Sequence, residues 1–188
     1  MRVVAGSLRG RPLKGFKGSR IRPTSDRVKE AIFNVLSSRG YFTARPNVLD
    51  IFAGTGALGI EALSRGAEKV VFVDVSPLAA GLIKKNLENL GLAESAVILT
   101  YDSGRAIKEL CKRGALFDII FLDPPYDSAL IEASLGEAAS ILAPGGLVVA
   151  EGPKGLVIDL EKSGFRELDN RVYGDTAVFY LGKDEEQA

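Results

Sequence analysis

Residues 48–59 read Val-Leu-Asp-Ile-Phe-Ala-Gly-Thr-Gly-Ala-Leu-Gly, an apolar run that passes directly into three spaced glycines. The glycines Gly54, Gly56 and Gly59 match the pattern Gly-x-Gly-x-x-Gly, which is typical of a strand that turns into a helix at a cofactor site. Asp74 lies 20 residues after Gly54, at the end of the next apolar run. The stretch therefore predicts the first strand, loop and helix of an open α/β sheet.

Short apolar runs alternate with helical segments along the rest of the chain. This alternation is typical of a doubly wound, mostly parallel sheet with helices on both faces. Parallel strands are expected at 48–52, 69–73, 97–100, 117–122 and 146–150, and helices at 57–65, 77–90, 104–113 and 128–142. Two further strands, 166–172 and 177–181, are expected to close the sheet as an antiparallel hairpin around Gly174-Asp175.

Composition limits the kinds of chemistry that the chain can carry. The 188 residues contain no histidine and one cysteine, Cys111, so His-based triads are excluded and an internal disulfide or a zinc site is not expected. No N-terminal stretch resembles a signal peptide, and no apolar run approaches the ~20 residues that span a bilayer. We expect one domain in a monomeric cytoplasmic protein that binds no metal and no membrane.

Charge is distributed unevenly, although the net charge is zero. Residues 1–30 carry nine Lys and Arg and two acids, whereas the remaining residues carry 15 basic and 22 acidic side chains. A basic N-terminal arm indicates a polyanionic partner, and the alternative is a solvated, flexible tail. Residues 1–40 are expected to form this basic extension together with a helix over 25–38. Residues 41–182 are expected to form the sheet domain, and residues 183–188 a disordered tail.

Residues 123–126 read Asp-Pro-Pro-Tyr and follow the apolar run 119–122. Two prolines fix the backbone and remove N–H donors, so neighbouring carbonyls are left to face a ligand. A carboxylate, carbonyls and an aromatic ring at one place suit a planar base that bears an exocyclic amine. The alternative is an ordinary turn at the end of a strand.

Carboxylates close the first four strands of the expected sheet, where ligands bind in open α/β folds. Asp50 beneath the glycine loop would repel a pyrophosphate, whereas the sulfonium and ammonium of S-adenosylmethionine would be attracted. Asp74 would then accept the ribose hydroxyls and Asp102 the adenine amine. Helix capping is the alternative for each acid. The cofactor site is expected to comprise Asp50, Phe52, Ala53, Gly54, Gly56, Asp74, Val75, Asp102 and Ser103.

The chain resembles the RsmD family of S-adenosylmethionine-dependent methyltransferases. Besides the loop, the acids and Asp123-Pro124-Pro125-Tyr126, the resemblance includes residues 9–13, 22–34, 62–67 and 173–176, and it spans about residues 1–182. It implies a seven-stranded Rossmann-like methyltransferase sheet and methylation of the N2 amine of a guanine in 16S ribosomal RNA, within a small-subunit assembly intermediate. The acid at position 74 is commonly Glu in this family, so Asp74 reaches one methylene less far.

The resemblance implies a role for each group of site residues. Asp123, Pro124, Pro125 and Tyr126 would be catalytic, with the acid and the Pro124 carbonyl orienting the amine and the ring stacking on the base. The product would be S-adenosylhomocysteine. RNA contacts are expected from Arg9, Arg11, Lys14, Arg20, Arg22 and Arg27.

Rival functions are a DNA adenine-N6 methyltransferase, which carries the same tetrapeptide, and a glutamine-N5 protein methyltransferase, whose tetrapeptide is Asn-Pro-Pro-Tyr. From a different class, an NAD-dependent dehydrogenase or a nucleotide-binding module shares the glycine pattern. Binding of S-adenosylhomocysteine rather than NAD separates the methyltransferases from this class.

Overall fold

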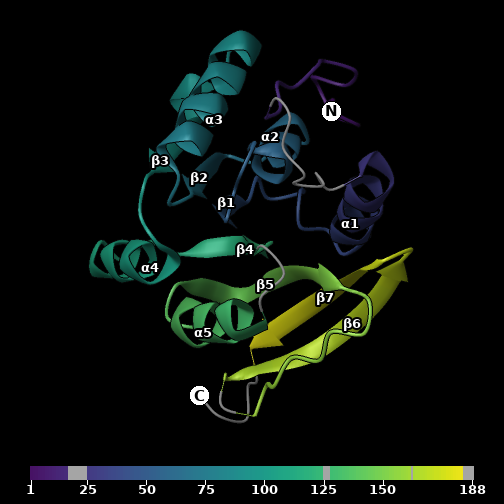
Figure 1. Ribbon diagram of the computed structural model, residues 1–188, viewed down its shortest axis with the longest axis vertical. Helices are drawn as coiled ribbons and strands as arrows, with labels where there is room; N and C mark the ends of the chain where they lie inside the picture. Colours follow the sequence, from purple (N-terminus) through teal and green to yellow (C-terminus); the bar gives the residue numbers. More distant parts are fainter. Residues whose placement is uncertain (17–24, 125–127, 162, 184–188) are drawn as a thin grey trace.

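The computed structural model describes residues 1–16, 25–124, 128–161 and 163–183. Within them the chain forms β1 (Asn47–Ile51), β2 (Lys69–Val73), β3 (Ala96–Leu99), β4 (Phe117–Leu122), β5 (Leu142–Pro153), β6 (Phe165–Tyr173) and β7 (Thr176–Lys183). The strands make one seven-stranded sheet in the order β3-β2-β1-β4-β5-β7-β6 (Figure 1). Strands β1 to β5 are parallel, and β7 is antiparallel to both β5 and β6. The predicted doubly wound sheet with a closing hairpin is confirmed.

The helices are α1 (Asp26–Ser38), α2 (Ala57–Ser64), α3 (Pro77–Leu90), α4 (Ser103–Lys112) and α5 (Ser128–Ala138), with a short 3-10 turn, η1 (Ala93–Ser95). Their ends follow local chemistry. Ser25 caps α1 and Ser76 caps α3, each through a side chain that accepts from a backbone N–H in the first turn. Pro77 stands in the first turn of α3, and Gly91 ends that helix in the left-handed region at a φ of 71°.

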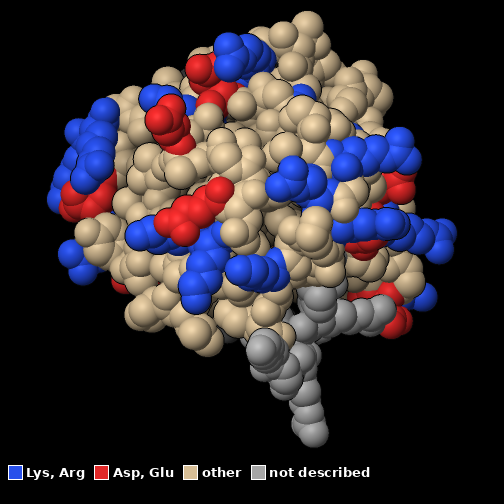
Figure 2. Space-filling model, turned by 90° about the horizontal axis from the view of Figure 1, so that it is seen from above, with Lys and Arg blue, Asp and Glu red and all other residues tan. Residues whose placement is uncertain are grey.

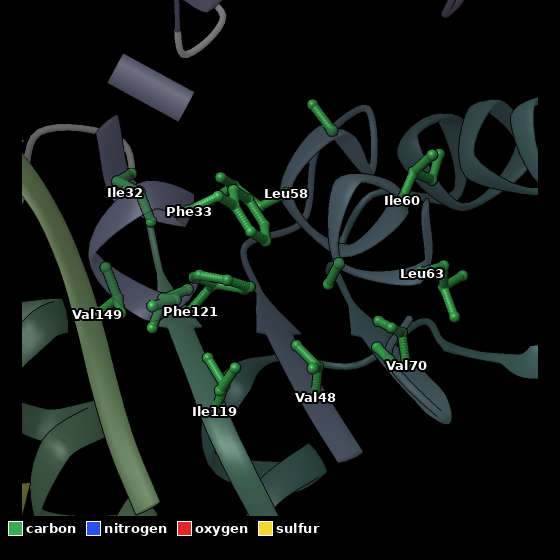
Figure 3. Close-up of a cluster of buried hydrophobic side chains, with 14 of the residues drawn as sticks. Ile32, Phe33, Val48, Leu58, Ile60, Leu63, Val70, Ile119, Phe121 and Val149 are labelled. Carbon is green, nitrogen blue, oxygen red and sulfur yellow. The ribbon is translucent and has the colours of Figure 1, made fainter. Parts of the chain in front are cut away.

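Helices cover both faces of the sheet. On one face α1, α2 and α3 pack against the sheet around Phe33, Ile60, Phe72, Phe121 and Tyr180. Figure 3 shows the centre of this cluster, where Phe33 of α1 lies over Phe121 of β4 and the side chains of α2 lie beside Val48 and Val70. On the other face α4 and α5 enclose a second core. Both faces of the central parallel strands β1 and β4 are therefore buried, which explains their largely apolar sequences.

The register of the parallel strands aligns the ends from which a ligand would be bound. Ile51 of β1 pairs with Val73 of β2 and with Leu122 of β4, and Val73 pairs with Leu99 of β3. The residues that follow these strand ends therefore emerge along the same edge of the sheet. This edge is the expected place of the ligand site.

One boundary prediction is wrong. The helix expected over 128–142 ends at Ala138, and β5 spans Leu142–Pro153 instead of 146–150. Ile141 and Leu142 are buried, and they continue the apolar spacing of the helix. The carbonyl of Ile141 nevertheless accepts a hydrogen bond from the backbone N–H of Phe117, at 2.9 Å. Apolar spacing alone does not separate a helix end from a buried strand start.

Residues 1–16 form a folded segment on the surface of the domain. The chain doubles back on itself, with Val3 N donating to the Arg11 carbonyl at 2.9 Å and Leu13 N to the Met1 carbonyl at 3.0 Å. Val3 and Leu13 are 0% and 6% exposed, and both belong to the core on the α1–α3 face. Two buried side chains are too few to produce a periodic signal, which is why the sequence did not reveal this segment as ordered.

None of the helices in the described ranges is long and apolar enough to cross a membrane.

Candidate active site

Three of the expected acids lie at one edge of the sheet. Asp74 directly follows β2 and Asp123 directly follows β4, and the strands between them end in register. Asp50 is the second-last residue of β1 and lies just below the same edge. Burial raises the pKa of Asp50 most, and the charges of Asp123 and Asp74 raise it further, so the three carboxylates share one neighbourhood.

Asp50 is the buried member of this group. It is 2% exposed, and its Oδ2 accepts a hydrogen bond from the backbone N–H of Gly59 at 2.9 Å. Burial raises the pKa of the Asp50 carboxyl to about 7, and the bond from Gly59 opposes that rise. Asp50 therefore sits beneath the glycine loop and ties the start of α2 to β1.

The glycine loop has the geometry that the sequence pattern predicts. Gly54 and Gly56 adopt positive φ angles of 54° and 77°, which side chains other than glycine rarely tolerate. A Cβ on Gly56 would meet the side chains of Ile83, Ile60 and Phe72 at 3.2–3.4 Å, and one on Gly59 would collide with Phe72. The first two glycines therefore shape the loop, and the third lets α2 approach β2 closely.

Phe52 and Ala53 join β1 to the glycine loop. Phe52 is a half-buried non-glycine residue with a φ of 63°. Ala53 is buried, and its N–H donates to the carbonyl of Val73 in β2 at 3.0 Å. Positive φ in a bulky residue costs on the order of 1 kcal/mol or more and is found mostly at functional sites. The chain therefore leaves the sheet through a strained turn at the predicted cofactor site.

Asp74 and Val75 lie opposite the glycine loop. Asp74 Oδ2 accepts from Gly54 N and Oδ1 accepts from Ser76 N, both at 2.8 Å. The carboxylate thus fastens the glycine loop to the end of β2, and its remaining lone pairs are still able to accept from a ligand. Val75 is 70% exposed, so an apolar side chain is presented to solvent beside this acid.

Asp102 and Ser103 begin α4. Asp102 Oδ1 accepts from Arg105 N at 2.9 Å and caps the helix, which is the alternative that the sequence offered for it. Ser103 Oγ lies 3.4 Å from Ser134 Oγ of α5. Strand β3 ends at Leu99, three residues before Asp102, so this acid stands farther along the chain from its strand than Asp74, which directly follows β2. Its part in cofactor binding stays a prediction.

Only part of the Asp-Pro-Pro-Tyr sequence is described. Asp123 is half-buried and Pro124 is buried at the end of β4. Pro125 and Tyr126 lie outside the described residues, so their predicted roles stay predictions. Within the described ranges no group of acids or cysteines has the arrangement of a metal site.

The basic residues predicted to contact RNA lie on two elements. Arg9, Arg11 and Lys14 are exposed on the N-terminal segment, and Arg27 is exposed in the first turn of α1. Arg20 and Arg22 lie outside the described residues. Arg11 and Lys14 line a shallow hollow against the end of α3, together with Asn89 and Leu90. Figure 2 shows basic side chains spread over the face seen from above, with fewer acidic ones between them.

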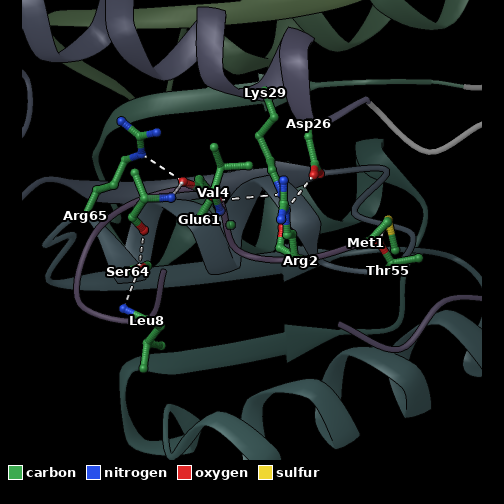
Figure 4. A network of polar contacts seen from close by, with 12 residues as sticks. Met1, Arg2, Val4, Leu8, Asp26, Lys29, Thr55, Glu61, Ser64 and Arg65 are labelled. Atoms are coloured by element: carbon green, nitrogen blue, oxygen red, sulfur yellow. Dashed lines mark hydrogen bonds and ion pairs between the residues drawn. The ribbon is translucent and has the colours of Figure 1, made fainter. Parts of the chain in front are cut away.

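Sequence reasoning missed a buried polar cluster that holds the N-terminal segment (Figure 4). Glu61 of α2 is 0% exposed and accepts from Val4 N at 2.7 Å, Ala5 N at 2.9 Å and Arg65 Nε at 2.9 Å. Lys29 of α1, 1% exposed, lies 3.6 Å from Glu61 and donates to a backbone carbonyl at 2.6 Å. Burial lowers the pKa of Lys29. Glu61, a charged residue inside the apolar sequence of α2, was the one sequence feature that could have indicated this cluster.

Comparisons with known proteins agree with this fold. The family model described as "Conserved hypothetical protein 95" matches residues 1–182. The Haemophilus influenzae "Ribosomal RNA small subunit methyltransferase D" is 38% identical over 157 residues, which are 82% of this chain and 79% of that protein. The chain belongs to the RsmD family.

Two other matches extend over similar lengths. The Bacillus subtilis protein "Putative rRNA methyltransferase YlbH" is 44% identical over 153 residues, which are 80% of this chain and 82% of that protein. A solved structure of "Putative methyltransferase yhhF" from Escherichia coli is 30% identical, has a TM-score of 0.82 and matches 98% of both chains. The predicted RsmD fold is therefore confirmed over nearly the whole chain.

Proposed function

We propose that the chain methylates the exocyclic N2 amine of a guanine in 16S ribosomal RNA, with S-adenosylmethionine as the methyl donor. The observation that carries this proposal is the placement of Asp123-Pro124 beside the loop formed by Gly54 and Asp74, in a member of the RsmD family. A cofactor loop and an amine-orienting carboxylate at one edge of a sheet are what such a transfer requires. The named relatives are rRNA methyltransferases, which supports an RNA methyltransferase here.

The residues at the loop fit S-adenosylmethionine better than they fit a dinucleotide. Asp74 and Asp123 bring two carboxylates to the edge of the sheet beside the loop, next to the buried Asp50, which disfavours a pyrophosphate and favours cationic groups. In this proposal Asp74 would accept from ribose hydroxyls, and the exposed Val75 would offer an apolar surface to adenine. The cofactor supplies a methyl group on a sulfonium, and the sulfur leaves as the thioether of S-adenosylhomocysteine.

The protein's own groups prepare the amine. The Asp123 carboxylate and the Pro124 carbonyl accept hydrogen bonds from the guanine N2 amine, which turns its lone pair away from the ring. When the nitrogen–carbon bond forms and the carbon–sulfur bond breaks, the surplus proton on N2 passes to Asp123 or to water. No histidine is needed because the amine becomes acidic as it is alkylated. Positioning of this kind lowers a barrier by ~7–11 kcal/mol in favourable cases.

The N-terminal segment and the start of α1 supply the surface for RNA. The exposed side chains of Arg9, Arg11, Lys14 and Arg27 would contact phosphates, which position RNA without reading its sequence. The target guanine would leave its stack to reach Asp123. We propose that the natural substrate is a small-subunit assembly intermediate in the cytoplasm and that the protein acts as a monomer.

Two measurements test the proposal. Calorimetric titration should show micromolar or tighter binding of S-adenosylhomocysteine and no binding of NAD, and the opposite preference would indicate a dehydrogenase. Incubation with methyl-labelled S-adenosylmethionine should label 16S ribosomal RNA and leave duplex DNA unlabelled. Labelled adenine in DNA would instead support the DNA adenine-N6 alternative.

A further inference from the structure

We propose that Asn86 of α3 is a positioning residue that couples RNA binding by the N-terminal segment to cofactor binding at the glycine loop. The inference rests on the proposed function, because it concerns how the two substrates of that reaction influence each other. In this proposal the buried side-chain amide of Asn86 contacts neither substrate. It controls how strongly binding of one substrate promotes binding of the other.

Asn86 joins two parts of the chain that are far apart in sequence. Its side chain is 1% exposed. Nδ2 donates to the carbonyls of Lys14 and Thr55, each at 3.1 Å, and Oδ1 accepts from Lys14 N at 2.9 Å. Both amide hydrogens and the carbonyl oxygen are thus in use. One side chain therefore holds the basic segment and the glycine loop at the same time.

The N-terminal segment follows α2 from one end to the other. Its turn lies at the end of the helix, where Leu8 N donates to Ser64 Oγ at 3.0 Å. Its two ends return to the glycine loop. Met1 Sδ lies 3.8 Å from Thr55 Oγ1 (Figure 4), and the backbone N–H of Lys14 donates to Asn86 Oδ1. A shift of the Thr55 backbone therefore alters the hydrogen bonds that hold the Lys14 backbone.

The loop residue that Asn86 holds stands between two glycines. Thr55 stands between Gly54 and Gly56, both at positive φ, and glycine backbones are easily rearranged. A cofactor seated on this loop favours one position of the Thr55 carbonyl. That position supports the hydrogen bonds of Asn86 and hence the placement of Lys14.

Lys14 carries this effect to the RNA. Its side chain is exposed, and together with Arg11 it borders the hollow at the end of α3. RNA that binds the Lys14 side chain would also order the Lys14 backbone, which Asn86 holds. By thermodynamic reciprocity, RNA must then tighten cofactor binding by the same factor by which the cofactor tightens RNA binding.

The substitution Asn86→Asp separates this role from simple packing. Aspartate has nearly the same size and still accepts from Lys14 N, but it loses both donors to the carbonyls of Lys14 and Thr55. Asn34→Asp makes the same change of charge at an exposed position of α1 and serves as the matched control.

The readout is the coupling factor, which is the ratio of the S-adenosylhomocysteine dissociation constants measured without and with a 16S ribosomal RNA fragment. We expect a factor of about 5 or more for the unaltered protein and for Asn34→Asp, and a factor of about 1 for Asn86→Asp. A buried amide that only stabilises the fold would lower the unfolding midpoint and leave this factor intact. A full coupling factor in folded Asn86→Asp, or no coupling in the unaltered protein, overturns the inference.

Hydrogen exchange gives an answer if Asn86→Asp does not fold. In the unaltered protein, S-adenosylhomocysteine alone should slow exchange of the Lys14 amide, although that amide lies outside the cofactor site. An unchanged exchange rate at Lys14, with slowed exchange at the glycine loop, refutes the coupling and leaves the proposed function standing. Failure of S-adenosylhomocysteine to bind at all refutes both.

Discussion

Asp50 Oδ2 accepts a hydrogen bond from the backbone N–H of Gly59 at 2.9 Å, in a position where the carboxyl is 2% exposed. The bond connects the C-terminal end of β1 to the first turn of α2 and so fixes the loop between them. A carboxylate at the N-terminus of a helix is also favoured by the helix dipole. Burial nevertheless dominates, since the pKa of Asp50 rises to about 7.

The raised pKa of Asp50 predicts a specific pH dependence of stability. The folded protein holds the Asp50 proton up to pH about 7, whereas the unfolded chain releases it near 3.8. The stability that comes from this proton is complete below the ordinary value and is lost as the pH rises through about 7. Asp50→Asn removes the titration but keeps an acceptor for Gly59.

Urea unfolding at a series of pH values between about 5 and 8 measures this effect. The free energy of unfolding of the unaltered protein, relative to Asp50→Asn, should decline across that range. A constant difference between the two proteins would mean that Asp50 is ionised throughout and that its burial does not control its charge.

Replacement of Asp123 should separate chemistry from cofactor binding. Asp123→Ala removes the group that orients the amine, so methyl transfer should fall by about 100-fold or more, while the dissociation constant of S-adenosylhomocysteine stays within a few-fold. The matched control is Asp118→Asn on the same strand, where the carboxylate accepts from Asn47 N at 2.8 Å at the opposite edge of the sheet. Equal turnover in Asp123→Ala and in the control would remove Asp123 from the mechanism.

The buried carboxylate of Glu61 should be essential to the fold. Glu61→Ala leaves Lys29 buried without its ion-pair partner and leaves the N–H groups of Val4 and Ala5 without an acceptor. Breaking a buried pair in this way costs about 3–5 kcal/mol, which urea unfolding measures directly.

An exposed ion pair is the comparison for Glu61. Glu68 lies 2.7 Å from Arg45, and its side chain is 45% exposed, so Glu68→Ala should cost less than about 1 kcal/mol. Similar losses for the two variants would show that the N-terminal segment is not held in place by Glu61.

Removing the positive charges beside the hollow should weaken RNA binding and its dependence on salt. Each phosphate contact contributes about 0.7 to the slope of log affinity against log salt for a single strand. The double variant Arg11→Ala, Lys14→Ala should therefore flatten the slope by about 1.4. Deletion of the whole segment is a poorer test, because Val3 and Leu13 are part of the core.

The matched control for RNA binding is Lys108→Ala, Lys112→Ala. These lysines lie on α4, which covers the other face of the sheet, and their side chains are 71% and 72% exposed. The control should retain the salt slope of the unaltered protein. An equal loss in both double variants would mean that RNA binding depends on overall charge and not on the N-terminal segment.

The sequence predicted the sheet and the acidic edge because both have local signatures. Continuous apolar strands, the cap at Ser76 and the glycines at 54 and 56 each follow from steric and hydrogen-bonding rules that act over a few residues. The end of α5 was placed too far along because Ile141 and Leu142 suit either element.

The contacts that hold the N-terminal segment could not be predicted in this way. Glu61 and Asn86 bond to backbone groups of residues more than 50 positions earlier in the chain. A backbone N–H or carbonyl leaves no trace in residue identity, so these partners appear only once the chain is folded. Of the buried Lys29–Glu61 pair, only Glu61 stands out in the sequence, as one charge in an apolar run, whereas Lys29 has charged neighbours.

The proposed reaction is methyl transfer to the N2 amine of a guanine in small-subunit ribosomal RNA. Its most direct test is incubation of 16S ribosomal RNA, naked and in partly assembled subunits, with the purified protein and methyl-labelled S-adenosylmethionine, followed by digestion and nucleoside mass spectrometry. We predict that the label appears as N2-methylguanosine at a single position, and that Asp123→Ala abolishes it. Label on adenine N6, on a ring nitrogen or on protein, or no label from folded, cofactor-bound protein, would rule out this reaction.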